Sequence, residues 1–108
     1  MSEATDKIRE HFNAMGVREI IVNEWGLTIY ATPVTLSERQ RIYSRSKGDN
    51  DYEVLAAILI AKAQDKDGTK MFTIEDKAVL LQRADSAVLI RVAAEIMNGG
   101  PPAAELKN

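Results

Sequence analysis

The chain has 108 residues, with 14 basic and 16 acidic side chains, a formal net charge of −2 and no cysteine. This length fits one domain, and the charge balance argues against nonspecific nucleic-acid binding, which normally needs a basic face. Without cysteine, disulfides, thiolate metal sites and cysteine nucleophiles are excluded. The longest apolar run, residues 54–61, is far too short to span a membrane. The N-terminus does not read as a secretory signal, so we expect a protein that stays in the cell that made it.

The N-terminal segment, residues 3–14, is predicted to form a short amphipathic helix. Ile8, Phe12 and Met15 are spaced along one of its faces. The only histidine of the chain lies on this segment, and we interpret it as a solvated side chain without a catalytic or metal-binding role.

Residues 17–32 are predicted to form a β-hairpin. The segment VREIIV is rich in β-branched residues, NEWG supplies the turn, and LTIYAT alternates between two faces until Pro33 stops the strand. Two roles are open for Trp25 in the turn. Its side chain is either an exposed anchor for a partner or folded over the hairpin into the core.

A helix over residues 36–46 begins with a capping box. The Thr35 hydroxyl can accept from the Glu38 amide while the Glu38 carboxylate reaches back to the start of the helix. Ile42 and Tyr43 contribute to a thin apolar stripe on this helix.

Residues 52–64, YEVLAAILIAKAQ, form the most apolar predicted helix. The run is rich in alanine and leucine and contains neither glycine nor proline, which favours helix over strand. A buried strand is the alternative, because short apolar runs are ambiguous. Since the run is apolar nearly all round, it is predicted to be the central helix of the core. Part of its surface, or of the helix predicted at residues 86–98, is expected to be shared with a second subunit.

The segment DKDGTKMFTIED, residues 65–76, must be tested as a calcium-binding loop. An EF-hand loop needs glycine at its sixth position and a bidentate acid at its twelfth. With Asp65 first, Lys70 takes the glycine position and Asp76 the twelfth. In the register that puts the glycine sixth, Ala63 and Ile74 take the first and twelfth positions. Neither register works, so no metal is expected.

The same segment is better explained as a turn followed by a helix start. The pair Asp67-Gly68 is typical of a tight turn. Thr73, followed by two acidic residues, is typical of a helix N-terminus. A helix is therefore predicted from Ile74 to about Arg83.

A last helix, residues 86–98, follows after a very short turn and is capped by Asp85. The pair of helices must be weighed as a DNA-binding helix-turn-helix. The second predicted helix contains one basic residue, Arg91, and the acidic Glu95 follows it one turn later. A recognition helix instead carries several polar or basic groups toward the DNA groove. We therefore expect no nucleic-acid partner.

These elements predict a mainly helical α+β domain over residues 1–98, with an N-terminal two-stranded β-hairpin and about four helices, followed by a flexible tail at 99–108. No catalytic, cofactor-binding or metal-binding residue is predicted. The candidates for partner binding are apolar side chains on predicted helix faces and in the hairpin turn: Trp25, Tyr43, Leu89, Val92 and Ile96.

The order of these features resembles the tail assembly chaperones of long-tailed bacteriophages. The resemblance covers residues 17–98. It rests on the hairpin VNEWGLTIYAT, the helix start TLSER, the apolar helix running into AQDKDGTKMFTIEDKAVLLQRAD, and the final helix ending VAAEIMNGG.

The resemblance implies a non-enzymatic chaperone without cofactors. Such proteins coat the tape-measure protein, keep its apolar helices soluble and help recruit tail tube subunits. It further implies a homo-oligomer in the host cell cytoplasm that is absent from the mature virion. Many of these chaperones also have a longer, frameshifted form, for which the Lys-Asn pair after Leu106 is a candidate slippery site. The alternative is a small accessory or regulatory domain that binds protein or DNA through its last two helices.

Overall fold

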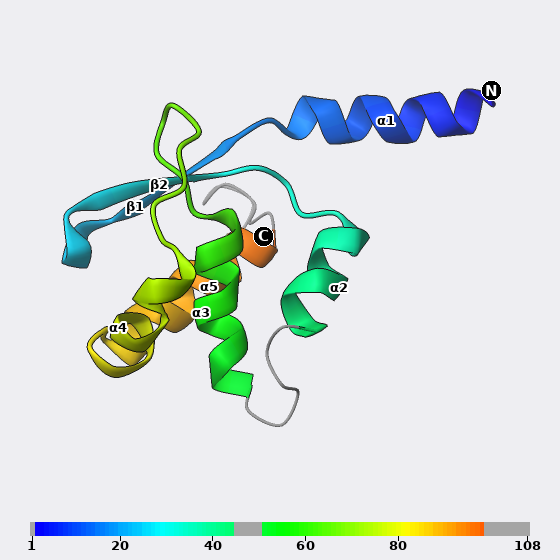
Figure 1. Ribbon diagram of the computed structural model, residues 1–108. Coiled ribbons are helices and arrows are strands. Elements are labelled where there is room, and N and C mark those ends of the chain that lie inside the picture. Colours follow the sequence, from blue (N-terminus) through cyan, green and yellow to red (C-terminus); the bar gives the residue numbers. More distant parts are fainter. Residues whose placement is uncertain (1, 45–50, 99–108) are drawn as a thin grey trace.

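The computed structural model describes residues 2–44 and 51–98 of the chain (Figure 1). It confirms the α+β class, with one antiparallel hairpin and five α-helices in these residues, where the sequence predicted about four. The predicted tail at 99–108 and the slippery site lie outside the described residues. The elements in chain order are α1 (Glu3–Met15), β1 (Arg18–Val22), the 3-10 turn η1 (Asn23–Trp25), β2 (Leu27–Ala31), α2 (Leu36–Ser44), α3 (Asp51–Lys62), the 3-10 turn η2 (Ile74–Asp76), α4 (Lys77–Gln82) and α5 (Ser86–Met97).

The predicted hairpin is confirmed, and its alternation places one face in the core. Strands β1 and β2 pair in antiparallel register, with Ile20 opposite Ile29. Ile20, Val22, Ile29 and Ala31 are all buried, whereas Ile21 between them is 62% exposed. One face of the hairpin therefore closes the core and the other meets solvent, as period-two patterning requires.

The apolar segment after residue 50 is a helix and not a strand, and α3 lies at the centre of the molecule. It packs against α2, α4 and α5. Ala56, Ile58 and Leu59 are almost completely buried. Apolar residues all round suit this position, because neighbouring elements cover α3 on several sides.

The turn after α3 extends the hairpin. Tyr30 and Gln64 exchange backbone hydrogen bonds of 2.8 and 3.0 Å, so the segment leaving α3 pairs with the edge of β2. The chain then reverses between Asp65 and Thr69, with Gly68 at a φ of 89° that few other residues adopt. The outer edge of β2 is thereby partly covered.

The C-terminal end of α5 is held by two arginines from distant elements. The Arg18 guanidinium on β1 donates to the Glu95 carbonyl, and the Arg39 guanidinium on α2 donates to the Met97 carbonyl at 3.3 Å. The last carbonyls of a helix have no partner within it and carry partial negative charge, so cations are favourable there. These contacts fasten the hairpin and α2 to the end of α5.

The N-terminal helix differs from the rest of the molecule. Figure 1 shows α1 running away from the body, on the side opposite α4. The Ser2 hydroxyl caps it by accepting from the Thr5 amide at 3.0 Å. None of its residues is buried by the described part of the chain. Within residues 2–44 and 51–98, no helix is long and apolar enough to cross a membrane.

Candidate functional site

An apolar groove lies between α3, α4 and α5, and we call it the helix groove. Its volume is about 590 Å³. The short turn between α4 and α5 brings these helices together, and the Asp85 carboxylate fixes the start of α5 by accepting from the Ala87 amide at 2.9 Å. The groove is lined by Tyr52 and Leu55 from α3, Leu80, Leu81 and Ala84 from α4 and the turn, and Ser86, Leu89 and Ile90 from α5.

The groove combines buried apolar side chains in its floor with exposed ones in its walls. Its floor includes Leu80 and Leu89, which are 4% and 5% exposed. Its walls include Tyr52, Leu81 and Ile90, which are 70%, 37% and 47% exposed. A concave, mainly apolar surface of this kind is a candidate binding site. Apart from the hydroxyls of Tyr52 and Ser86, the lining side chains are apolar, so the groove is suited to binding apolar side chains.

The structure places the five predicted partner-binding residues in different surroundings. Leu89 lies in the floor of the helix groove. Val92 and Ile96 are 0% and 1% exposed, because the inward face of α5 is covered by α3 and β1. Trp25 is half-buried and packs against the core, while Tyr43 on α2 is exposed and is not part of the groove.

Val92 and Ile96 are therefore covered by the chain itself, and their role in partner binding stays a prediction. The periodicity identified the apolar face of α5 but could not tell whether the same chain covers it. The residues that the structure adds to the candidate site are Tyr52, Leu81 and Ile90. Ile90 lies beside the stripe of buried residues on α5, and an isoleucine in that position is the signal that could have revealed the groove.

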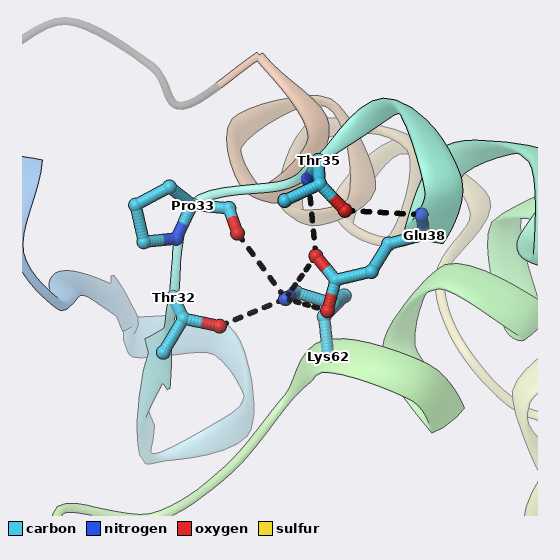
Figure 2. Close-up of polar contacts among 5 residues, drawn as sticks. All are labelled: Thr32, Pro33, Thr35, Glu38 and Lys62. Atoms are coloured by element: carbon cyan, nitrogen blue, oxygen red, sulfur yellow. Dashed lines mark hydrogen bonds and ion pairs between the residues drawn. The ribbon is translucent and has the colours of Figure 1, made fainter. Parts of the chain in front are cut away.

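A buried lysine joins α3 to the start of α2. Figure 2 shows the Lys62 ammonium pointing at the segment between β2 and α2. It donates to the Thr32 hydroxyl at 2.8 Å, to the Pro33 carbonyl at 3.4 Å, and to both carboxylate oxygens of Glu38 at 3.1 Å. The Lys62 side chain is only 5% exposed. A buried charge requires this degree of pairing, so the cluster is a structural clamp.

Glu38 belongs to this clamp and also to the predicted capping box, which is confirmed. Its carboxylate accepts from the Thr35 amide and its amide donates to the Thr35 hydroxyl, both at 3.1 Å. Burial raises the pKa of the Glu38 carboxyl, but the Thr35 amide and the Lys62 ammonium outweigh burial, so the net pKa is lowered. The ionised form of Glu38 is therefore the one that stabilises the fold.

Arg91, the basic residue of α5, forms an ion pair with Glu24 in the hairpin turn. The Arg91 guanidinium donates to both carboxylate oxygens of Glu24 at 2.9 Å. This hydrogen-bonded pair lowers the pKa of Glu24 from 4.5 to about 2. A bidentate, charge-assisted pair of this kind holds Arg91 of α5 against the hairpin turn.

The acidic turn after α3 uses its oxygens internally. Oδ1 of Asp65 accepts from the backbone amides of Asp67 and Thr69 at 2.8 and 3.0 Å. Thr73 and Asp76 form a capping box at the start of η2, which confirms the predicted turn and helix start. Among the described residues, no group of three or more histidine and acidic side chains could hold a metal ion.

No model of a known protein family matches the sequence, and comparisons with curated proteins and with solved structures give no significant match. The resemblance to tail assembly chaperones therefore rests on the residues and motifs of the chain itself.

Proposed function

We propose that this protein is a non-enzymatic tail assembly chaperone of a long-tailed bacteriophage. In this proposal it binds the tape-measure protein, keeps it soluble and helps recruit tail tube subunits in the host cytoplasm. The observation that carries the proposal is the helix groove, whose exposed walls and apolar floor suit the apolar face of a client helix.

The binding mode follows from the shape and chemistry of the groove. A helix laid between other helices presents apolar side chains at positions i, i+3 or i+4, and i+7. A long helical protein with such a stripe aggregates through it before assembly. Covering the stripe in the helix groove removes that surface from water, and the remaining polar face of the client keeps the complex in solution.

The proposal is tested by co-expression with the tape-measure protein encoded in the same genome. The chaperone should keep that protein in the supernatant, and Ile90→Glu should abolish this effect because it places a charge in the groove. The matched control is Ile21→Glu, which changes an isoleucine that is 62% exposed on the hairpin, outside the groove. Equal solubilisation by wild type and Ile90→Glu, or none by wild type, would reject the proposal.

The order of neighbouring genes gives an independent check. A tube-protein gene upstream and a very long tape-measure gene downstream are expected. An open reading frame that continues in the −1 register past Leu106 would add the expected longer form, while its absence would leave the chaperone proposal intact.

A further inference from the structure

A second groove is lined by α2, by α3 and by the segment that follows α3, and we call it the basic groove. Its volume is about 330 Å³, and no residue lines both this groove and the helix groove. At 3.6 residues per turn, Ala57 and Ala61 of the basic groove fall on a different side of α3 from Tyr52 and Leu55 of the helix groove. Helix α3 therefore contributes to two separate grooves.

The floor of the basic groove is apolar. Ile42 of α2 is 3% exposed, and Ala57, Ile60 and Ala61 of α3 are half-buried. Ile74 at the start of η2 adds an apolar side chain that is 67% exposed. The volume is at the lower end of the range for ligand sites, so the groove suits a short segment and not a whole helix.

Two ion pairs line the basic groove without adding a net charge. The Lys62 ammonium lies 3.1 Å from the Glu38 carboxylate, and the Lys77 ammonium lies 3.2 Å from the Glu53 carboxylate. The side chains of Lys77 and Glu53 are only 33% and 27% exposed. Both carboxylates that line the groove are thus already paired, and neither is left for a further cation.

Two more cations line the groove and are not paired in this way. Arg41 on α2 and Lys70 in the segment after α3 are exposed. Among the side chains that the structure describes, no carboxylate forms an ion pair with either of them. The acidic residues Glu75 and Asp76 do not line the groove, and the Asp76 carboxylate accepts from the Thr73 amide at 2.8 Å. The groove therefore has a surplus of positive charge, although the whole chain carries −2.

We propose that the basic groove binds a short acidic segment of a protein partner, in which an apolar side chain is flanked by carboxylates. The apolar side chain enters the floor beside Ala57 and Ala61, where it is removed from water. The flanking carboxylates pair with Arg41 and Lys70. Charge complementarity selects this occupant, because the same two cations repel a basic segment and a neutral segment gains nothing from them. This site goes beyond the proposed function, which rests on the helix groove alone.

The two grooves differ in chemistry, so they select different ligands. The helix groove is lined mainly by apolar side chains, whereas charged side chains surround the apolar floor of the basic groove. Since no residue is shared, a protein with both grooves holds an apolar client and an acidic partner at the same time. Neither ligand should displace the other.

A nuclear magnetic resonance titration of the full chain, labelled with nitrogen-15, tests the proposal. The probe is a blocked synthetic pentapeptide with leucine at its centre and two acidic residues on each side. The amide signals of residues 57–61 and 70–74 should shift as the peptide is added. Binding should weaken as salt is added, because charges at the surface are screened beyond about 10 Å at 0.1 M.

Two variants should weaken the binding of this peptide. The double variant Arg41→Glu/Lys70→Glu should raise the dissociation constant about tenfold, because each change replaces an attraction by a repulsion. Both side chains are exposed, so the fold should tolerate the changes. Ala57→Leu fills the floor of the groove and should weaken binding by a similar factor. Circular dichroism verifies that each variant is folded, and the double variant keeps the test valid if Ala57→Leu unfolds.

Matched controls separate the groove from general effects of charge. Arg9→Glu/Arg83→Glu makes the same change of charge at two exposed residues outside the basic groove, and it should bind the peptide almost as the wild type does. Ile90→Glu, which alters the helix groove, should also leave the dissociation constant unchanged. Because this titration contains no tape-measure protein, its failure leaves the proposed function standing, and failure of the proposed function leaves this result standing.

Each alternative outcome overturns the proposal. If the leucine peptide does not bind, the groove is not a site of this kind. Equal binding of inorganic phosphate, or of a peptide with glycine in place of leucine, means a simple anion site. Equal binding of a peptide with glutamine in place of its acidic residues means that charge plays no part. Unchanged binding to the double variant at Arg41 and Lys70, or loss of binding in Ile90→Glu, places the peptide elsewhere. Groove signals that shift with protein concentration alone mean that a second copy fills the groove.

Discussion

Helices α3 and α1 are almost equal in length, with 12 and 13 residues, but their surroundings are opposite. In α3, Ala56 and Leu59 are 0% exposed and Lys62 is drawn into a buried clamp. In α1, no residue is buried by the described part of the chain. The difference teaches that the described chain buries most of α3, apart from the part that lines the helix groove, and buries none of α1.

The largest expected effect comes from shortening an apolar side chain in each helix. Leu59→Ala should lower the free energy of unfolding by about 2–5 kcal/mol, since it leaves a cavity in the core. Ile8→Ala should change the free energy of unfolding by less than about 0.5 kcal/mol in dilute solution, where α1 has no partner. Urea unfolding at low protein concentration measures both. A comparable loss in both variants would contradict the contrast between α3 and α1.

The clamp at the end of α3 should respond unequally to the loss of its two charges. Glu38→Gln should cost about 3 kcal/mol, because it leaves the Lys62 ammonium buried with only neutral acceptors. Lys62→Met should cost about 1 kcal/mol, because the Glu38 carboxylate is 31% exposed and keeps its Thr35 amide. The double variant should be more stable than Glu38→Gln alone, as urea unfolding of all three will show. Equal losses from the two single variants would refute the clamp.

Acid should weaken the contacts made by carboxylates with lowered pKa. A carboxyl whose folded pKa lies below its unfolded value stabilises the fold above the unfolded pKa, and this stabilisation is lost as pH falls. For Glu24 the window runs from 4.5 down to about 2. Glu24→Gln should reduce the dependence of the urea midpoint on pH in this window, modestly because the Glu24–Arg91 pair is exposed. Glu10→Gln on α1 serves as the control, and an equal reduction there would argue against the pair.

The smallest expected effect is that of calcium. The Asp65 carboxylate already accepts two backbone amides, so the turn after α3 does not require an ion. Thermal melting curves with millimolar calcium and with a chelator should coincide. A ligand that binds only the folded state raises its stability, so an increase of several degrees would show that the turn is a metal site.

Much of the body could be predicted from the sequence because its signals are local. β-Branched residues around NEWG indicated the hairpin, and Thr35 with Glu38 indicated the helix start. The apolar run around Leu59 indicated the central helix. Each of these patterns expresses a preference of neighbouring residues, and the tertiary structure agrees with it.

The site was harder to predict because it depends on which surfaces the chain covers for itself. Val92 and Ile90 are both apolar residues of α5, yet only the first is buried. The burial of Lys62 follows from the placement of Glu38 and Thr32 around its ammonium group, which are 24 and 30 residues away in the chain. Periodicity identifies a face of a helix, but the three-dimensional fold determines its partner.

Hydrogen exchange of the wild-type chain in dilute solution tests the contrast between α1 and α3 most directly. The amides of α3 should be protected, because the core of the chain buries Ala56 and Leu59. The amides of α1 should exchange quickly, because no described residue buries this helix. Equal protection of the two helices would contradict the account.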